Sequence, residues 1–283
     1  MRTYPVSFVG NAFRLVDCRE VGQHDWPSVA RDVCWGQDPN RAECDGLLVF
    51  DPTDAPHLRM FNPDGTEDFC GNGLLCAAAY AWQSGAVRER KFTIIHGGRQ
   101  VDAELELEGD TVRRAAVMLP APIFAADRIP VVYAHSANIP FRLDVDDVPY
   151  PLWPVSMGTA HAVIFTESEV SEEEFQKWSP LIENHPAFPE RTTVDWVTSQ
   201  GNGRASVRIW ERGVGETLGC GTGAAAVAVT GFGRLHRGTL EVQSKGGVLR
   251  VNWPGHGPVR IGGTVSMPAT ESVPTSEENR PVG

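Results

Sequence analysis

Short apolar runs, most of them with glycine, proline or aspartate close by, recur along the chain and predict strands. Residues 101–110, VDAELELEGD, alternate between apolar and charged side chains, which is typical of a half-exposed antiparallel strand that ends in a Gly-Asp turn. Gly201-Asn202-Gly203 predicts another hairpin turn. The other predicted strands are GLLVF at 46–50, FTII at 92–95, AAVML at 115–119, HAVIF at 161–165, RASVRIW at 204–210 and LEVQS at 240–244.

Two alanine-rich segments, residues 71–85 and 221–235, are apolar on most faces and predict central helices enclosed by sheet. Each segment follows directly on a cysteine, in a Cys-Gly-x-Gly motif that begins at Cys70 or at Cys220. A turn-containing stretch precedes each motif, FNPDGTEDF in the first case and WERGVGETLG in the second. The chain therefore contains an internal repeat of one strand–loop–helix unit, with the two cysteines 220 − 70 = 150 positions apart.

The domain organisation follows from a break near the middle of the chain. Pro120-Ala121-Pro122 fits neither a helix nor a central strand. We therefore expect an α/β (α+β) fold with two pseudo-symmetric lobes. Residues 1–120 form the N-terminal lobe that carries Cys70, and residues 121–263 form the C-terminal lobe that carries Cys220. Residues 264–283 are polar and contain proline, which predicts a C-terminal segment that is mostly a disordered tail.

The composition excludes several classes of function. Lys and Arg number 25 and Asp and Glu number 36, so the formal net charge is 25 − 36 = −11, which argues against a nucleic-acid partner. The sequence has no apolar run of about 18 residues and no secretion signal, so we expect no membrane partner. Six cysteines are few for 283 residues, which favours a cytoplasmic protein with reduced thiols.

The motifs also argue against a bound metal or cofactor. The chain has no CxxC pair, no His/Cys cluster with the spacing of metal ligands, and no glycine-rich phosphate loop that opens a dinucleotide fold. We therefore expect no metal ion and no cofactor. A redox or metal protein and a pure binding module are the alternatives from other classes. Bound zinc would indicate the former, and ligand affinity without turnover would indicate the latter.

The repeated motif suggests a particular chemistry. A cysteine at the first turn of a helix lies where unpaired backbone N–H groups and the helix dipole favour negative charge, so we expect a lowered thiol pKa. The same N–H groups, made accessible by glycine, can bind a carboxylate. Two such sites on opposite sides of one substrate would let one thiolate remove an α-proton while the opposite thiol returns one. The carbon would then change its configuration, and the N–H groups would stabilise the developing negative charge.

These motifs resemble the diaminopimelate epimerase-like family of cofactor-independent amino-acid racemases and epimerases. The resemblance extends to about residue 263 and implies two mirror-related lobes, each a mixed sheet wrapped around a central helix. It also implies an amino acid as the small-molecule substrate, and a homodimer, although the C-terminal aromatic residue expected near 264–268 is missing. The matching segments are FVGNAFRLVD (8–17), DGLLVF (45–50), MFNPDGTEDFCGNG (60–73), VSMGTAHAVIF (155–165), PLIENHPAFPERTTVDWV (180–197) and WERGVGETLGCGTGAA (210–225).

The resemblance assigns roles to residues at matching positions. Cys70 and Cys220 would be the two acid/base thiols, and Glu211 and His161 would tune their pKa values. The residues that would bind substrate are Asn11, Asn62, Gly71, Asn72, Arg212, Gly221 and Thr222. Simpler interpretations remain open for three of these positions: His161 as a core histidine, Glu211-Arg212 as a surface ion pair, and Asn62 as the first residue of a Pro-Asp-Gly turn.

Several positions depart from the family pattern. Thr159 and Thr193 replace asparagines that hold the distal end of diaminopimelate in the family's diaminopimelate enzymes, and Ala12 and Leu75 also differ. A threonine offers one hydroxyl, whereas an amide offers two donors and an acceptor. We therefore expect a different substrate, a polar or cationic amino acid with histidine as a candidate. Diaminopimelate is the alternative substrate, and isomerisation of a double bond in an unsaturated acid is a further alternative.

Overall fold

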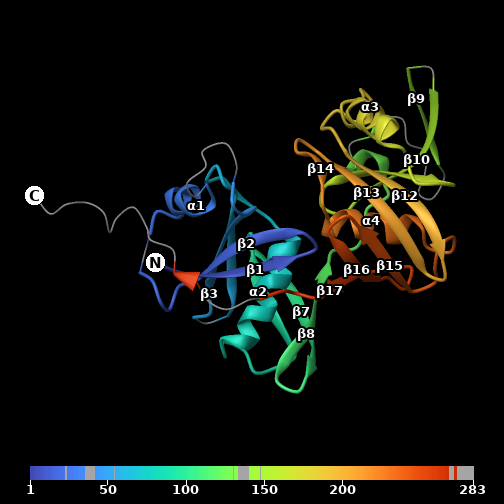
Figure 1. Ribbon diagram of the computed structural model, residues 1–283. Helices are drawn as coiled ribbons and strands as arrows, with labels where there is room; N and C mark the ends of the chain where they lie inside the picture. The colour runs from blue at the N-terminus through green and yellow to red at the C-terminus, as the bar shows by residue number, and fades with distance from the viewer. Residues whose placement is uncertain are drawn as a thin grey trace, which may run out of the picture. The chain divides into compact units, whose positions relative to one another are not determined.

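The structure is a computed structural model that describes residues 1–22, 24–35, 42–53, 55–129, 131–132, 140–146, 148–267 and 271–272. The chain divides into two compact units (Figure 1). Unit 1 is Met1–Val117 together with the chain from Gly262 onward, and unit 2 is Met118–Ile261. The division at 117/118 is next to the Pro120-Ala121-Pro122 break, and unit 2 ends at Ile261, two residues before the end of the expected C-terminal lobe. Most of the predicted tail, 268–270 and 273–283, lies outside the described residues.

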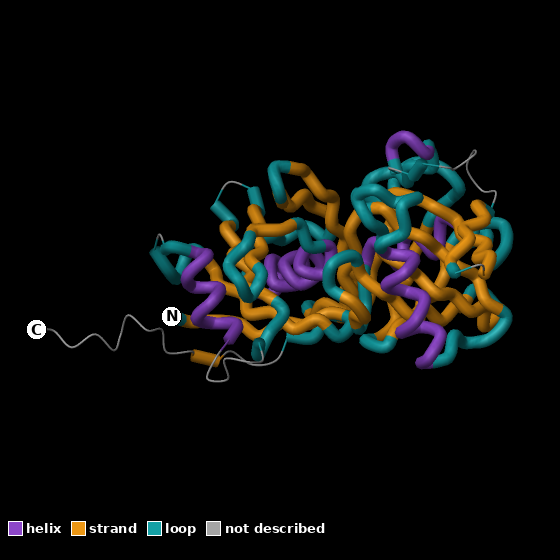
Figure 2. Tube along the Cα trace, turned by 90° about the horizontal axis from the view of Figure 1, so that it is seen from above, coloured by secondary structure: helices purple, strands orange, loops and turns teal. Residues whose placement is uncertain are grey.

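Unit 1 is a mixed sheet with a buried helix. Its elements are β1 (Arg2–Phe8), β2 (Asn11–Asp17), α1 (Trp26–Trp35), β3 (Gly46–Asp51), β4 (His57–Phe61), β5 (Glu67–Asp68), α2 (Gly71–Gln83), β6 (Lys91–His96), β7 (Arg99–Glu108), β8 (Thr111–Leu119) and β18 (Glu271–Ser272). The strand order is β18-β1-β2-β3-β4-β6-β7-β8, with β5 paired to β4. Helix α2 packs against β1, β2, β3, β4, β6 and β7, so the sheet wraps around it, as the helix enclosed by strands in Figure 2 illustrates.

Unit 2 repeats this plan. It contains η1 (Ala126–Arg128), β9 (Phe141–Val145), β10 (Val148–Ser156), β11 (Ala160–Thr166), α3 (Glu172–Glu183), β12 (Thr193–Gly201), β13 (Arg204–Glu211), β14 (Gly215–Thr217), α4 (Gly221–Thr230), β15 (Thr239–Ser244), β16 (Gly247–Asn252) and most of β17 (Val259–Gly263). The strand order is β9-β10-β11-β12-β13-β15-β16, with β14 beside β13. Helix α4 packs against β10, β11, β12, β15 and β16.

The two units share one succession of strand directions. In unit 1 the pairs β1–β2, β3–β4 and β6–β7 are antiparallel, while β2–β3 and β4–β6 are parallel. In unit 2 the pairs β10–β11, β12–β13 and β15–β16 are antiparallel, while β11–β12 and β13–β15 are parallel. Parallel neighbours need a crossover connection, and a helix lies within each of these four crossovers. The repeat predicted from the two Cys-Gly-x-Gly motifs therefore extends to the whole topology.

The predicted helices and strands are present. The strands predicted from short apolar runs correspond to β3, β6, β8, β11, β13 and β15, and the alternating segment is β7. The Gly201-Asn202-Gly203 turn joins β12 to β13, with φ between 51° and 73° at all three residues. Helix α4 ends at Thr230, five residues before the predicted end, where Gly231 caps it and Gly233 has a φ of 80°.

Sequence patterns missed α1, α3 and several strands. Helix α3 is amphipathic, and only a stripe that includes Phe175, Trp178 and Ile182 is buried. It also contains Pro180, a residue that normally argues against a helix. It begins at a capping box in which Ser171 Oγ accepts the Glu174 N–H and the Glu174 carboxylate accepts the Ser171 N–H. Strand β10 carries three prolines. They are tolerated because, among the described residues, Pro149 and Pro151 pair only with β9 and Pro154 pairs only with β11, so each proline has one side without a ladder partner.

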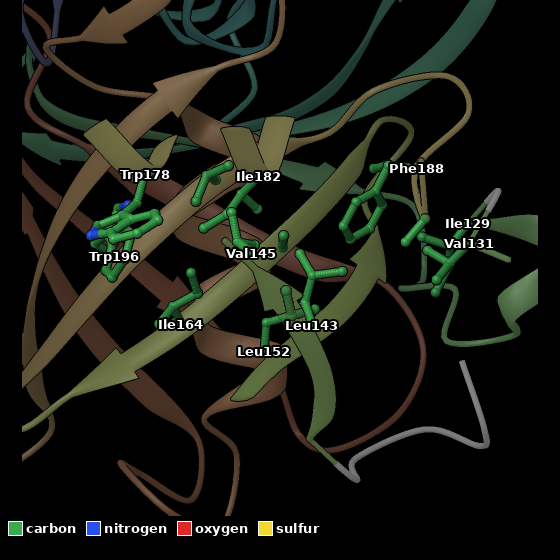
Figure 3. Close-up of a cluster of buried hydrophobic side chains, with 14 of the residues drawn as sticks. Ile129, Val131, Leu143, Val145, Leu152, Ile164, Trp178, Ile182, Phe188 and Trp196 are labelled. Carbon is green, nitrogen blue, oxygen red and sulfur yellow. The ribbon is translucent and has the colours of Figure 1, made fainter. Parts of the chain in front are cut away.

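The core of unit 2 that lies under α3 is apolar and aromatic (Figure 3). Trp178 and Ile182 of α3 lie over Ile164, Trp196 and Leu152, which come from β11, β12 and β10. The buried indole of Trp196 donates to Ser179 Oγ at 3.0 Å, so its polar atom is satisfied inside the core. Within the described ranges, no helix is both long and apolar enough to cross a membrane.

Candidate functional site

The first candidate group lies at the start of α2 in unit 1. Cys70 is the N-cap residue, with φ −131° and ψ 110°, and its Sγ accepts the backbone N–H of Gly73 at 3.3 Å. Glycine is needed at position 73, because a Cβ there would lie 2.8 Å from Leu48 Cδ2. A Cβ at Gly71 would meet nothing within 4 Å, so the space beside the first turn is open. The sulfur therefore lies at the positive end of the helix dipole, next to accessible N–H groups.

The second group repeats this geometry at the start of α4 in unit 2. Cys220 is the N-cap residue, with φ −136° and ψ 122°, and its Sγ accepts the Gly223 N–H at 3.4 Å. Thr222 Oγ1 lies 3.2 Å from the same sulfur. A Cβ at Gly223 would lie 2.8 Å from Asp195 Oδ1, so glycine is again required. Both Cys-Gly-x-Gly motifs are therefore helix caps in which a thiol occupies the place that Ser, Thr, Asp or Asn usually takes.

The expectation of a lowered thiol pKa is wrong for Cys220. Burial of the side chain, which is 9% exposed, raises its pKa to about 12. The negative charges of Glu211 and Asp195 act in the same direction, while the hydrogen bonds from Thr222 and Gly223 lower the pKa by less. The pKa-lowering effect expected from the helix N-terminus is thus outweighed by desolvation of the thiol and by the charges of two nearby carboxylates. The charge of Glu211 favours the protonated form of this thiol.

Two of the predicted substrate residues of unit 1 meet at the start of α2. Asn72, which is buried, donates through Nδ2 to Asn11 Oδ1 at 2.5 Å, and its own Oδ1 has no partner among the described residues. Asn62 lies in the turn that begins at the end of β4 and donates to Thr66 Oγ1 at 3.0 Å. Its backbone also closes that turn, through hydrogen bonds with Gly65 and Thr66. The side chain of Asn62 therefore serves the turn in this structure.

His161 and Thr159 form a hydrogen-bonded chain with Asp195, a residue that the sequence analysis missed. His161 Nδ1 lies 2.8 Å from Asp195 Oδ2, and His161 Nε2 lies 3.3 Å from Thr159 Oγ1. His161 and Asp195 are completely buried, on the neighbouring parallel strands β11 and β12. The histidine is thus satisfied within the core, as the simpler interpretation expected, yet its partner Asp195 also acts on the Cys220 thiol.

Glu211 and Arg212 lie at the end of β13, in a turn that reaches β14. The turn is tight, since Val214 N–H donates to Glu211 O at 3.0 Å and Gly213 has a φ of 79°. The backbone N–H of Arg212 donates to Thr193 Oγ1 at 3.2 Å, and its guanidinium donates to Glu190 O at 3.2 Å. The unit 2 candidates Glu211, Arg212 and Thr193 therefore come together at this turn.

A buried carboxylate that the sequence analysis missed holds this turn. Glu183, 5% exposed, accepts from the Gly213 N–H at 2.8 Å, from Trp210 Nε1 at 2.7 Å and from Arg191 at 3.2 Å. It is the last residue of α3, where the helix dipole disfavours negative charge. An acidic residue at this end of an amphipathic helix was the signal that could have identified it.

His96 is a further residue that the sequence did not single out. Its Nε2 accepts the backbone N–H of Cys70 at 2.9 Å, and its Nδ1 donates to Leu58 O at 2.8 Å. Burial lowers its pKa, which favours the neutral ring that these two bonds require. The ring of Phe69 stacks on it at a centroid distance of 4.7 Å. His96 therefore fixes the backbone that presents the Cys70 sulfur.

Comparisons with known proteins identify the class. The family model described as diaminopimelate epimerase matches residues 154–267. A diaminopimelate epimerase of Desulforudis audaxviator is 38% identical over 264 residues, which cover 90% of this chain and 92% of that protein. In fold, the chain is similar to a probable proline racemase from Agrobacterium radiobacter K84, with a TM-score of 0.67, 15% identity and coverage of 98% and 94%. It is also similar to a methylitaconate-delta-isomerase, with a TM-score of 0.65, 11% identity and coverage of 96% and 95%.

The curated relative identifies the chain as an isomerase of the racemase and epimerase class, and the solved structures share its mixed, sheet-dominated α+β fold. The identity and coverage of the Desulforudis protein are high enough to establish more than the fold. The chain belongs to the diaminopimelate epimerase family.

The raised pKa of Cys220 gives a first prediction. Because the thiolate forms only as the pH approaches 12, Cys220 should contribute no thiolate absorbance at 240 nm between neutral pH and about pH 9. The difference spectrum between the wild type and Cys220→Ser measures this contribution. Glu211→Gln removes one of the charges that raise the pKa, so titration should begin at lower pH in that variant. A Cys220 thiolate already formed at neutral pH would contradict the assignment.

The contacts of Glu183 give a second prediction. Glu183→Ala leaves the Gly213 N–H and the Trp210 indole N–H without their acceptor, so the free energy of unfolding should fall by about 2–3 kcal/mol. Urea unfolding followed by tryptophan fluorescence measures the change. Glu173→Ala, at an exposed position of the same helix, is the matched control and should change stability by less than about 0.5 kcal/mol. Equal effects of the two substitutions would show that Glu183 does not hold the turn.

Proposed function

We propose that the chain inverts the α-carbon of an amino acid without a cofactor, with the thiols of Cys70 and Cys220 as the two acid/base groups. The observation that carries this proposal is the duplicated thiol cap. Each sulfur accepts the N–H three residues on, at 3.3 Å and 3.4 Å, at the start of the central helix of each repeat. Sulfur is a weak hydrogen-bond acceptor, so a cysteine in both caps favours a chemical role over a structural one.

The reaction needs the two caps to act on opposite faces of one substrate. The substrate Cα–H bond breaks as its proton moves to one Sγ, and a new Cα–H bond forms on the other face with the proton of the second Sγ. The charge left on carbon in between spreads into the substrate carboxylate. The first-turn N–H groups of Gly71, Asn72, Gly221 and Thr222 are the proposed donors to that carboxylate and stabilise the charge.

The electrostatics of unit 2 favour one starting state. Burial and the charge of Glu211 keep the Cys220 thiol protonated, so Cys220 serves as the acid in the first turnover and Cys70 as the base. Glu211 then has the role of keeping Cys220 protonated. His161 acts on the same thiol indirectly, through its hydrogen bond to Asp195. Asn72 Oδ1 and the side chain of Asn11 are the proposed contacts for the substrate ammonium group.

We further propose that the substrate is a polar or cationic amino acid other than diaminopimelate. Thr159 and Thr193 stand where the family's diaminopimelate enzymes carry asparagine. Each hydroxyl already has a partner within unit 2, His161 Nε2 in one case and the Arg212 N–H in the other. Each position therefore offers the distal end of a substrate fewer hydrogen bonds than an amide would, and each lost contact to a buried polar group costs about 1–3 kcal/mol.

Diaminopimelate is the second candidate substrate. The protein from Desulforudis audaxviator that is 38% identical to this chain is named diaminopimelate epimerase. Asn62, Glu211 and Arg212, three of the residues assigned by the resemblance, are also present in this chain. An enzyme for diaminopimelate would use the same two thiols and would differ only in how the distal end is held.

Exchange of the α-proton tests both candidates. The reduced protein is incubated in deuterated water with a panel of L-amino acids that includes lysine, arginine, histidine and diaminopimelate, and loss of the α-proton signal is followed by NMR. We expect exchange with one of the first three. Cys70→Ser and Cys220→Ser should each slow the conversion of one enantiomer into the other by about 10²–10⁴-fold, since each removes the acid/base group of one face.

Two other outcomes would overturn parts of this account. Fast exchange with diaminopimelate alone would make that compound the substrate. No exchange with any amino acid, together with isomerisation of a methylaconitate-type acid, would show that the double bond of an unsaturated acid is the reacting group. Full activity of both serine variants would exclude the thiols as acid and base.

A further inference from the structure

Two cysteines of unit 1 that the proposed reaction does not use lie next to each other. Cys34 is near the end of α1, Cys44 precedes β3 by two residues, and their sulfurs are hydrogen-bonded at 3.2 Å. Cys34 is completely buried and Cys44 is 6% exposed, in an apolar core that α1 forms with β3 and β4. Both are free thiols, so two unoxidised sulfurs that are 10 positions apart in the sequence are in direct contact.

The distance between the sulfurs fits a disulfide-forming dithiol better than a metal site. Two thiolates on a tetrahedral zinc ion lie about 3.8 Å apart, because each Zn–S bond is about 2.3 Å long. The sulfurs here are closer than that, and the described part of the chain holds no group of three His, Cys, Asp or Glu residues suited to a metal ion. A disulfide bond is about 2.05 Å long, so the sulfurs have to approach by only about 1.2 Å.

The backbone on both sides of Cys44 keeps the two sulfurs together. On one side, the Glu43 N–H donates to Cys34 O at 2.6 Å. On the other side, the Asp45 N–H donates to Ala12 O at 2.7 Å. Cys44 is thus held from both directions beside Cys34, and a bond between the sulfurs requires no rearrangement of the fold.

Cys44 is favoured as the first of the two thiols to react. It is the more accessible, and its hydrogen bond with Cys34 lowers its pKa, although burial opposes this effect. The charge of Arg14 also lowers the pKa of Cys44. The thiolate is the form that reacts with oxidants, so both effects favour oxidation at Cys44. Cys34 needs no access to solvent, because its sulfur already lies against that of Cys44.

From this geometry we propose that Cys34 and Cys44 are a redox modification site, which a hydroperoxide converts into a disulfide between α1 and the segment before β3. Hydrogen peroxide oxidises the Cys44 thiol to a sulfenic acid and is itself reduced to water. The Cys34 sulfur then attacks the Cys44 sulfur, the S–OH bond breaks, and the hydroxyl leaves as water with the proton of Cys34. Two thiols and one peroxide give one disulfide and two water molecules, and a reducing dithiol reverses the reaction by exchange.

Helix α1, on one side of this pair, holds the turn that carries Asn62. Trp35 Nε1 donates to Pro63 O at 2.8 Å, and the Arg31 guanidinium donates to Asp64 O at 2.9 Å. Both acceptors are backbone atoms of the turn that follows β4. The position of α1 therefore determines how firmly the Asn62 turn is held.

The segment of Cys44, on the other side, holds the residue next to Asn11. Asp45 Oδ2 accepts the Ala12 N–H at 2.7 Å, in addition to the bond from the Asp45 N–H to Ala12 O. A disulfide between Cys34 and Cys44 therefore ties the support of Asn62 to the support of Asn11. Formation of the bond does not depend on the reaction proposed above, in which neither thiol takes part.

Peptide mapping of the full chain tests whether the bond forms. The protein is treated with hydrogen peroxide, remaining thiols are blocked with iodoacetamide, and tryptic peptides are analysed by mass spectrometry without reduction. Trypsin cuts after Arg31, Arg41 and Arg59, so Cys34 and Cys44 fall in separate peptides, 32–41 and 42–59. We expect these two peptides to be joined after oxidation and to separate on treatment with dithiothreitol.

Variants distinguish this bond from oxidation elsewhere. Cys34→Ala should abolish the cross-link and leave Cys44 as a sulfenic acid that dimedone labels. Cys18→Ala removes a half-buried cysteine of the same unit and should keep the cross-link. Oxidation of Cys70 or Cys220 while iodoacetamide still blocks both Cys34 and Cys44 would overturn the proposal. If Cys34→Ala does not fold, the peptides of the wild type and of Cys18→Ala still decide between these outcomes.

Hydrogen exchange tests how far the effect of the bond extends. In the oxidised protein, the amides of Ala12, Glu43 and Asp45 should exchange about tenfold more slowly, because the bond suppresses openings that separate α1 from the segment before β3. The amide of Gly65, which closes the Asn62 turn, should also exchange more slowly. Peroxide treatment of Cys34→Ala is the control and should change none of these rates. Equal rates in oxidised and reduced wild type would show that the bond does not tie the two supports together.

These readouts are separate from the proposed function. Cross-linked peptides from a protein that exchanges no α-proton would support the dithiol and overturn the racemase. Exchange of the α-proton by a protein whose Cys34 and Cys44 remain reduced under peroxide would support the racemase and overturn the dithiol.

Discussion

The structure depends on the hydrogen bond that begins each of its two central helices. A cysteine sulfur accepts the backbone N–H three residues further on, and glycine at that residue lets Leu48 in one unit and Asp195 in the other approach the helix closely. An oxygen cap would stabilise the helix start better than sulfur does. Two thiols in equivalent caps therefore give both helix starts a weaker cap than an oxygen would, and this is the observation from which the proposed chemistry is argued.

The surroundings of the two caps differ, although the fold repeats. Around Cys70, the neutral ring of His96 holds the backbone, and Asn72 and Asn11 supply amide groups. Around Cys220, Glu211 and Asp195 supply negative charge, and burial adds to their effect on the thiol. A repeated scaffold with unequal electrostatics suits a reaction in which one group must begin with a proton and the other without one. The duplicated topology places each thiol at the N-terminus of a central helix, and the two carboxylates of unit 2 favour the protonated form of Cys220.

Much of the fold could be predicted from the sequence because the strongest signals are local. The Cys-Gly-x-Gly motifs, the alanine-rich helices and the apolar strand runs are contiguous in the chain, and the repeat made them easier to recognise. Helix α3 and strand β10 were missed because proline normally argues against such elements. Here the packing of one face of α3 and the pairing of β10 with β9 and β11 outweigh the effect of the prolines. The capping of α2 and α4 by cysteine followed from the motif, but the ionisation of Cys220 did not. Its pKa depends on burial and on Asp195, 25 residues away in the sequence (220 − 195). Glu183 and His96 were missed for the same reason, since their partners lie in other elements.

The central claim is that two thiols act on opposite faces of one carbon, and the position of the first deuterium tests it most directly. A single enantiomer of the substrate is converted in deuterated water, and product and remaining substrate are separated early in the reaction and analysed by mass spectrometry. Two separate acid/base groups predict deuterium at the α-carbon of the product and almost none in the remaining substrate, because the proton removed by one thiol is not the one that the other returns. Equal incorporation of deuterium into substrate and product from the start would mean that one group serves both faces, and would contradict the account.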